Sequence, residues 1–483
     1  MADLDWPRDG RHIFVGGDWL ELTGADRIES VSPIDEEVCG YAAAARAEDV
    51  DRAVDLITPA LAEWAALGVV ARVPYLRRFA DAIAAHADQL AALETLDGGL
   101  TAATAARDIE TAVDSLGFFS SYAYELTGST YSAPAGTAAY TVREPYGIVG
   151  CIVPFNHPIM FAVQYAAPVL LAGNAVIIKP AEQAPLSTLL LAEIARGVLP
   201  DGVFNVITGY GHEAGDAIVG HPRIPRIGFT GSVPTGRRVL ETAARHIKHV
   251  SLELGGKNPL IVTADADADF AAQVAYSGMN FTHAGQSCQS TSRVLVHTDR
   301  YDEVVERLAE RMRGIVVGDP RDEKTVTGPL TFRAHLDRVL GYIDSGIEEG
   351  ARLVVGGHRP DHLPKGFYLQ PALFADVTPQ MRIAREEIFG PVVSVMRYVD
   401  VDEAVQIANA TEYGLTARVV AGTLDEAAAI GRRIEAGTTL LNTAGPRRRG
   451  MPFGGHKASG LGKQSCLEEV LSYTQEKSVV AAV

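Results

Sequence analysis

The chain has 483 residues, which is too long for one ordinary hydrophobic core and predicts two or three domains. Hydrophobic residues make up 47% and charged residues 21%, a balance typical of globular proteins that argues against a disordered chain. The formal net charge of -17 argues against nucleic acid and anionic membrane surfaces as partners.

The N-terminal part of the chain reads as polar and then helical. The first ten residues lack the basic and apolar regions of a secretory signal, so we expect a cytoplasmic protein. Residues 49–116 are rich in alanine, and their apolar positions recur every three or four residues, which predicts helices. Residues 128–143 predict a β-hairpin around Pro-Ala-Gly. Together with a strand at 472–480, this hairpin could form an oligomerisation element.

From Tyr146 onward, short β-branched runs alternate with amphipathic helical segments. Runs bounded by Gly and Pro, each followed by a helix, predict parallel strands with crossover helices and a doubly wound dinucleotide-binding sheet. The apolar stretch 165–178 is interrupted by Pro168, Gly173 and Asn174, so no membrane span is predicted. The predicted strands lie within residues 146–154, 174–180, 202–209, 226–231 and 249–256.

A second α/β series follows Gly256. Residues 258–263, 292–297 and 391–398 predict strands, and residues 267–281 and 300–314 predict helices. We therefore expect an α/β fold with a second α/β domain, which contains Cys288.

The four cysteines, Cys39, Cys151, Cys288 and Cys466, are far apart in the sequence. They form no C-x-x-C pair and no metal-binding spacing, so neither a disulfide framework nor a zinc site is predicted. Most free cysteines are buried and inert. Cys288, however, lies in "HAGQSCQSTSR", among glycine, amide and hydroxyl side chains. Either it is one more structural thiol, or it is a reactive thiol.

Two polar residues follow the predicted strand at 174–180. Lys179 and Glu182 lie where open α/β sheets bind ligands, and a carboxylate there can accept both hydroxyls of a ribose. The alternative is a surface ion pair.

Glycine-rich turns follow two other predicted strands. "GYGHEAG", which ends at Gly215, resembles a dinucleotide fingerprint with altered spacing. In "GFTGSVPTG", the residues Gly231, Ser232 and Gly236 could bring a helix N-terminus up to a pyrophosphate. Each turn by itself is a weak signal.

Two further residues suit chemistry at a carbonyl group. Glu253 stands between two leucines in "SLELGGKNP", and burial would make it a usable general base. Asn156 follows a strand in "CIVPFNHPI", where its carboxamide could donate to an oxyanion. The alternatives are a carboxylate paired with a cation and an ordinary turn asparagine.

Seven motifs occur together in one order: "PFNHP", "KPAEQAP", "GFTGS", "LELGGKNP", "GQSC", "EEIFGPV" and "PFGGHKASGLG". Through them the chain resembles the aldehyde dehydrogenase superfamily from about Phe14 to its C-terminus. The resemblance implies a Rossmann-like cofactor domain of residues 1–126 and 144–254 and a catalytic domain of residues 255–458. It also implies an oligomerisation element of residues 127–143 and 468–483, within a homodimer or homotetramer.

The resemblance also implies roles for individual residues in the NAD-dependent oxidation of a small aldehyde. Cys288 would be the nucleophile, Glu253 the general base, and Asn156 with the Cys288 backbone N–H the oxyanion hole. NAD would be the cofactor. Its contacts would come from Phe155, Lys179, Glu182, Gly215, Gly231, Ser232, Gly236, Glu387 and Phe389.

Several readings stay open. A coenzyme A-acylating relative would typically lack Glu253, and an inactive structural or binding relative would typically lose the nucleophile or the base. Gln464 stands where many relatives have a glutamate credited with proton relay, a role that glutamine cannot take. Arg447–Arg449 could make the mouth of the substrate tunnel basic, with His157 opposite, or they could be a solvated loop.

Overall fold

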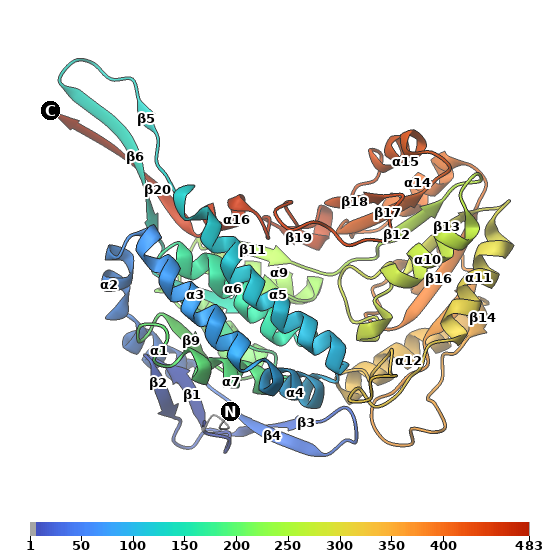
Figure 1. Ribbon diagram of the computed structural model, residues 1–483, viewed down its shortest axis with the longest axis horizontal. Coiled ribbons are helices and arrows are strands. Elements are labelled where there is room, and N and C mark those ends of the chain that lie inside the picture. Colours follow the sequence, from blue (N-terminus) through green and yellow to red (C-terminus); the bar gives the residue numbers. More distant parts are fainter. Residues whose placement is uncertain (1–5, 483) are drawn as a thin grey trace.

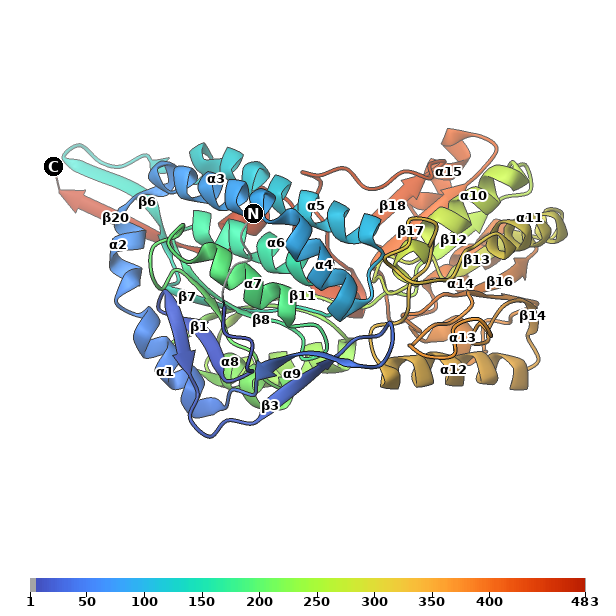
Figure 2. The ribbon, with the colours of Figure 1, turned by 60° about the horizontal axis from the view of Figure 1, so that its bottom comes forward.

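The computed structural model describes residues 6–482, and two large β-sheets organise most of this range (Figure 1, Figure 2). The first sheet has the strand order β19-β11-β10-β7-β8-β9-β1-β2. Its central strands, from β11 to β9, are parallel, and they are the five strands predicted between residues 146 and 256. The strands are β1 (His12–Val15), β2 (Asp18–Glu21), β7 (Ile148–Ile152), β8 (Ala175–Lys179), β9 (Phe204–Val206), β10 (Arg226–Thr230), β11 (His249–Glu253) and β19 (Gly460–Leu461).

Helices cover both faces of this sheet, because the apolar side chains of its strands alternate between two cores. Val176 and Ile178 of β8 pack into one core with α2–α7 and α16, whereas Ala175 and Ile177 pack into the other with α1, α8 and α9. The predicted helical region, residues 49–116, falls within α1–α5. The helices are α1 (Ala47–Ile57), α2 (Ala60–Ala66), α3 (Val69–Ala85), α4 (Ala87–Gly98), α5 (Ala102–Ser120), α6 (Pro158–Leu171), α7 (Leu186–Ala195), α8 (Asp216–Gly220), α9 (Val233–Ala244) and α16 (Leu467–Leu471).

The second sheet has the order β14-β15-β16-β13-β12-β17-β18, and all its neighbours except β14 and β15 pair in parallel. Helices α12–α15 share a core with one face, and α10 and α11 with the other. The predicted α/β fold is therefore confirmed. The elements are β12 (Pro259–Val262), α10 (Ala268–Gly278), β13 (Arg293–His297), α11 (Tyr301–Arg313), α12 (Arg333–Glu348), β14 (Arg352–Val355), β15 (Ala372–Ala375), α13 (Arg382–Arg385), β16 (Val392–Tyr398), α14 (Val401–Asn409), β17 (Thr416–Val420), α15 (Leu424–Gly431) and β18 (Thr438–Leu441).

A third, small sheet projects from the body as an arm (Figure 1). It consists of β5 (Thr130–Tyr131), β6 (Thr137–Pro145) and β20 (Thr474–Ala482), so the predicted hairpin and C-terminal strand both form and lie together. A separate hairpin joins β3 (Arg27–Val31) to β4 (Val38–Ala43). None of the helices within residues 6–482 is long and apolar enough to cross a bilayer.

A short connection joins the two large sheets. Strand β11 ends at Glu253 in the first sheet, and β12 begins at Pro259 in the second. The carboxyl ends of the parallel strands β7, β8, β10 and β11 share one edge of the first sheet, so the residues that follow them meet there.

Candidate active site

A cavity of about 550 Å³ lies at the edge of the first sheet where its parallel strands end. Residues from the regions around both large sheets line this cavity. Its volume falls within the usual range of ligand pockets. Residues predicted from the sequence to form the site line it from segments far apart in the chain. They are Phe155, Asn156, Gly231, Ser232, Glu253, Cys288, Glu387 and Phe389.

The loop that carries Cys288 is fixed by close backbone contacts. Gly285 has a φ of 68°, and a Cβ at this position would lie 2.5 Å from the carbonyl of Gly390, so only glycine fits. The Asn258 side-chain amide donates to the carbonyl of Cys288 at 2.7 Å and to that of Ser290 at 2.9 Å. The loop therefore holds the thiol at the cavity wall.

The electrostatics of Cys288 differ from what its sequence neighbours suggest. Small polar neighbours favour an accessible, stabilised thiolate. In the structure, burial, with a smaller contribution from the carboxylates of Glu253 and Glu387, raises the pKa of the Cys288 thiol to about 12. The reason is tertiary, because enclosure and carboxylates distant in sequence outweigh the local composition. Burial also raises the pKa of Cys39 and Cys466, so the position on the cavity distinguishes Cys288, not its pKa.

Glu253 is a buried carboxylate with free acceptor capacity. It ends β11 beside Thr230 of β10 and is 4% exposed. Neither of its carboxylate oxygens has a hydrogen-bond partner among residues 6–482. Burial raises the pKa of Glu253 well above its ordinary value, Glu469 raises it further, and the positive charges of Lys463 and Arg447 oppose the shift. A carboxyl group in this setting can act as a general base near neutral pH.

Asn156 lies beside the Cys288 loop, just before α6. Its Nδ2 donates to the carbonyl of Gln286 at 2.9 Å, which fixes the amide and leaves its second N–H available. The side-chain amide of Gln286 is itself held, because its Oε1 accepts from the Thr331 N–H at 3.1 Å. Asn156 and Cys288 line the same cavity, so the carboxamide can donate to an oxyanion formed there.

Lys179 and Glu182 form an ion pair at the end of β8, with Nζ and Oε2 3.6 Å apart. Lys179 is buried and also donates to the Pro180 carbonyl at 3.0 Å. A Cβ at Gly215 would lie 3.7 Å from the lysine chain. The lining of the large cavity does not include these residues, which lie beyond β7 in the sheet.

The N-terminus of α9 meets the cavity through Ser232. Its hydroxyl caps the helix and accepts from the Thr235 N–H at 3.4 Å. A Cβ at Gly236 would lie 2.7 Å from Leu254, so glycine lets the helix pack closely there. Since helix N-termini bind anions, this end suits a phosphate group.

Glu387 reaches across from the second unit to the connection between the sheets. Its Oε1 accepts from the Gly256 N–H at 3.0 Å, and a Cβ at Gly255 would lie 1.9 Å from its Oε2. Burial raises the pKa of Glu387 to about 7. Glu387 lines the cavity, and its second carboxylate oxygen can accept from a ribose hydroxyl there.

Aromatic rings form one wall of the cavity. The Phe155 ring lies 5.2 Å from that of Phe332 and 5.8 Å from that of Phe389, measured between centroids. Phe389 has a φ of 59°, and its carbonyl accepts from His335 Nε2 at 2.8 Å. Such a wall suits a planar ring.

Sequence reasoning missed part of the lining. Phe332, His335, Arg338 and Tyr342 all face the cavity from the start of α12. Their spacing of three or four residues marks one helix face, a signal that was available in the sequence. Arg338 donates to the Glu387 carbonyl at 2.8 Å and so helps to hold that residue.

The donor set fits a dinucleotide. Carboxylates at Glu182 and Glu387 suit ribose hydroxyls, and the capped N-terminus at Ser232 suits a pyrophosphate. The aromatic wall at Phe155 and Phe389 suits a nicotinamide ring.

Comparisons with known proteins agree with this geometry. The profile of the "Aldehyde dehydrogenase family" matches residues 19–479. "Aldehyde dehydrogenase tropH" of Talaromyces stipitatus is 43% identical over 476 residues, which cover 97% of this chain and 92% of that protein. PnpE from Pseudomonas sp. WBC-3 has a TM-score of 0.94 at 38% identity, with 98% of both chains covered.

A third comparison includes the cofactor. A point mutant of betaine aldehyde dehydrogenase from Staphylococcus aureus, solved with NAD+ and a BME-modified cysteine, has a TM-score of 0.94 at 32% identity and covers 98% of this chain and 96% of its own. Near-complete coverage by the profile and by these relatives leaves no part of the fold unmatched except its ends. The chain therefore belongs to the aldehyde dehydrogenase family.

Proposed function

We propose that this protein oxidises an aldehyde to the carboxylic acid with NAD, by covalent catalysis at Cys288. The observation that carries the proposal is the convergence of three groups on one cavity: the Cys288 thiol, the unpartnered carboxyl of Glu253 and the fixed amide of Asn156. These are a nucleophile, a base and an oxyanion donor.

The residues of the chain account for the covalent steps. The Cys288 thiol loses its proton to solvent and its sulfur adds to the aldehyde carbon, and the resulting oxyanion accepts hydrogen bonds from Asn156 Nδ2 and the Cys288 backbone N–H. When bound, the dinucleotide supplies the hydride acceptor that oxidation to the thioester requires. Glu253 then takes a proton from water, whose oxygen bonds to the acyl carbon as the C–S bond breaks. The carboxylic acid leaves, and the proton held by Glu253 passes to the Cys288 thiolate.

The cofactor would lie along the strand ends. Glu182 would accept both hydroxyls of the adenosine ribose, and because its negative charge would repel a 2′-phosphate, NAD is preferred to NADP. Glu387 would accept from the nicotinamide ribose. The remaining contacts would come from Phe155, Lys179, Gly215, Gly231, Ser232, Gly236 and Phe389.

Each of the three sheets belongs to one proposed domain. Residues 1–126 and 144–254 form the cofactor domain, residues 255–458 the catalytic domain, and residues 127–143 and 468–483 the oligomerisation element of a homodimer or homotetramer. Exposed apolar side chains on the arm, Tyr131 at 57% and Val480 at 74%, support its burial by another copy. The four free thiols support a cytoplasmic location.

Spectrophotometry at the NADH absorbance, with a panel of aldehydes in the presence and absence of coenzyme A, tests the proposal. We expect NADH and the free acid without coenzyme A. Formation of NADH only with coenzyme A would identify an acylating enzyme, and no NADH with any aldehyde would identify a binding or structural relative.

A further inference from the structure

The three consecutive arginines after β18 have different surroundings. Arg448 is exposed, whereas Arg447 is half-buried and turns inward. The Arg447 guanidinium carbon lies 4.8 Å above the Phe453 ring, and its nitrogens donate to the Met451 carbonyl at 2.9 Å and to Ser465 Oγ at 3.4 Å. The simple interpretation of all three as a solvated loop therefore fails for Arg447, whereas Arg448 and Arg449 are exposed.

The charge of Arg447 has no direct counter-ion. Within residues 6–482 no carboxylate lies within 4 Å of its guanidinium, and its buried Nε has no acceptor. The carboxyl groups that face it, Glu253 and Glu469, are both buried, and burial raises the pKa of Glu469 to about 8. Neither carboxyl group forms a direct ion pair with Arg447, and the arginine stays charged. An uncompensated, partly buried cation is unfavourable unless a ligand pairs with it.

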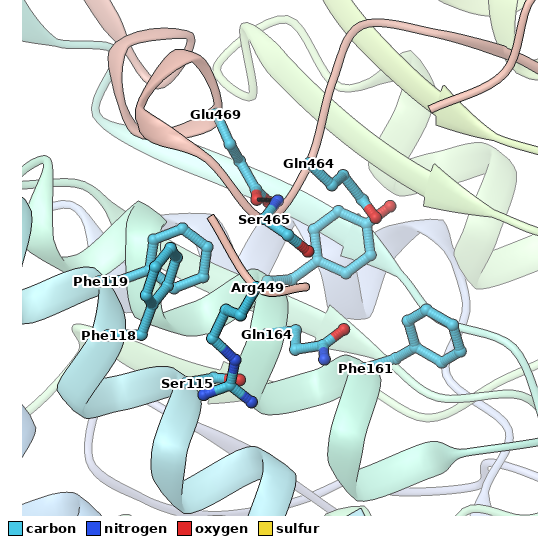
Figure 3. Close-up of a pocket in the computed structure, with 10 residues that line it drawn as sticks. Ser115, Phe118, Phe119, Phe161, Gln164, Arg449, Gln464, Ser465 and Glu469 are labelled. Atoms are coloured by element: carbon cyan, nitrogen blue, oxygen red, sulfur yellow. Dashed lines mark hydrogen bonds between the residues drawn. The ribbon is translucent and has the colours of Figure 1, made fainter. Parts of the chain in front are cut away.

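A small polar pocket lies next to this arginine. It holds about 20 Å³, and Ser465, which accepts from Arg447, forms part of its wall (Figure 3). Arg449 lines the same pocket, and its weak partner Asp114 is 3.9 Å away. The other polar residues of the wall are Ser115, Gln164, Gln464 and Glu469.

The small pocket adjoins the cavity that contains Cys288, because Phe161 lines both. A volume of this size accepts one small polar group and no further ring. An aldehyde whose carbonyl carbon lies at Cys288 would thus extend along Phe161 and place its other end beside Arg449 and Ser465, with Arg447 behind Ser465. His157 is not free for such a role, because its Nδ1 lies 2.5 Å from Asp108 Oδ2 and its ring stacks on His283.

We propose that the physiological substrate is an aldehyde that carries a carboxylate at its far end. This carboxylate binds in the small pocket against Arg449, and the charge of Arg447, behind Ser465, supports it there. The inference rests on the proposed function and specifies its substrate class. Arginine suits the role because its planar donors match the two oxygens of a carboxylate.

Matched substrate pairs test the inference. We would measure kcat/KM for 4-formylbenzoate and its methyl ester, and for succinic semialdehyde and its methyl ester. The wild type should prefer the acid of at least one pair by about tenfold or more. Arg449→Gln should lower kcat/KM for that acid by about 10- to 100-fold, the value of a charge-assisted hydrogen bond, and for its ester by less than about threefold. Arg447→Gln should act in the same direction.

Arg448→Gln is the matched control, because it removes the same charge from the neighbouring exposed position. It should change neither substrate's kcat/KM. Arg447→Lys, which keeps the charge, should retain part of the preference for the acid even if Arg447→Gln folds poorly. Equal losses for acid and ester in Arg447→Gln, the same effect in Arg448→Gln, or a wild type that prefers the esters would overturn the proposal.

A binding measurement separates this inference from the proposed function. Terephthalate and succinate should slow the alkylation of wild-type Cys288 by iodoacetamide more than their monomethyl esters do. Arg449→Gln should remove this difference, and Arg447→Gln should reduce it. If the wild type oxidises no aldehyde, the proposed function fails. The slower alkylation with dicarboxylates than with their monoesters does not require turnover, so it still tests whether the pocket binds a carboxylate. No protection by either dicarboxylate would count against the site.

Discussion

Replacing Glu253 with glutamine should separate the two halves of the proposed reaction. The substitution keeps the shape of the side chain, and no hydrogen bond is lost, because neither carboxylate oxygen has a partner within residues 6–482. Steady-state turnover should fall by about 10²- to 10⁴-fold, the usual contribution of a positioned base. Formation of the thioester with Cys288 should still occur in the variant, since the charge of Glu253 opposes ionisation of the thiol.

The expected rate of alkylation follows from the pKa of the Cys288 thiol. The pKa of Cys288 is raised from 9.0 to about 12, and each unit changes the thiolate fraction tenfold, so at pH 9 about one thiol in a thousand is ionised. The rate of alkylation by iodoacetamide should therefore rise about tenfold per pH unit up to about pH 12. Because glutamine removes a negative charge near the sulfur, Glu253→Gln should be alkylated at least as fast as the wild type at each pH.

Rapid-mixing absorbance and intact-protein mass spectrometry supply the measurement. Glu253→Gln should produce one burst of NADH, stoichiometric with active sites, and then stall with an acyl group on Cys288. Cys288→Ala should show neither the burst nor the adduct. A Glu253→Gln protein that gives no burst and is alkylated more slowly than the wild type would show that Glu253 deprotonates Cys288, which would refute this assignment of roles.

Three further outcomes are expected. The wild type should show at least about tenfold higher kcat/KM with NAD than with NADP, a difference of about 1.4 kcal/mol. Glu182→Gln should reduce this preference for NAD. Equal kcat/KM with NADP in the wild type would contradict the role of Glu182. Asn156→Ala should lower kcat by about 10²- to 10³-fold through loss of an oxyanion donor, and a loss below tenfold would exclude that role. Deleting residues 474–482 removes the strand that pairs with all of β6, so light scattering after gel filtration should show monomers; an unchanged mass would place the oligomer contact elsewhere.

Local patterns were sufficient for much of the fold. The five strands between residues 146 and 256 and the hairpin near residue 137 could be predicted because β-branched runs between glycines and prolines depend on neighbours in the sequence. The motif order also predicted most of the cavity, since residues after parallel strands meet at one sheet edge. Glu253 and Asn156 come together in this way, whereas Cys288 precedes β13 of the second sheet and reaches the cavity from that side.

Properties that depend on tertiary contacts were not predictable. The raised pKa of Cys288 comes from enclosure and from Glu387, a residue far along the chain. The hydrogen bond from Gly256 to Glu387 and the pairing of His157 with Asp108 join residues without any local signal. The difference between Arg447 and Arg448 likewise depends on Phe453 and Ser465, which no local pattern relates to the arginines.

The pairing of β19 with β11 has a consequence for biosynthesis. Leu461 lies opposite Leu252, and the Leu254 N–H donates to the Ser459 carbonyl at 2.9 Å. The edge strand of the first sheet therefore comes from near the C-terminus of the chain. A ribosome makes the entire second sheet before that strand emerges. Until then, a nascent chain carries β11 with an open edge, which is a template for mispairing with other chains. Translation that stalls before residue 460 should therefore yield a product that aggregates, with Glu253 on its unprotected border.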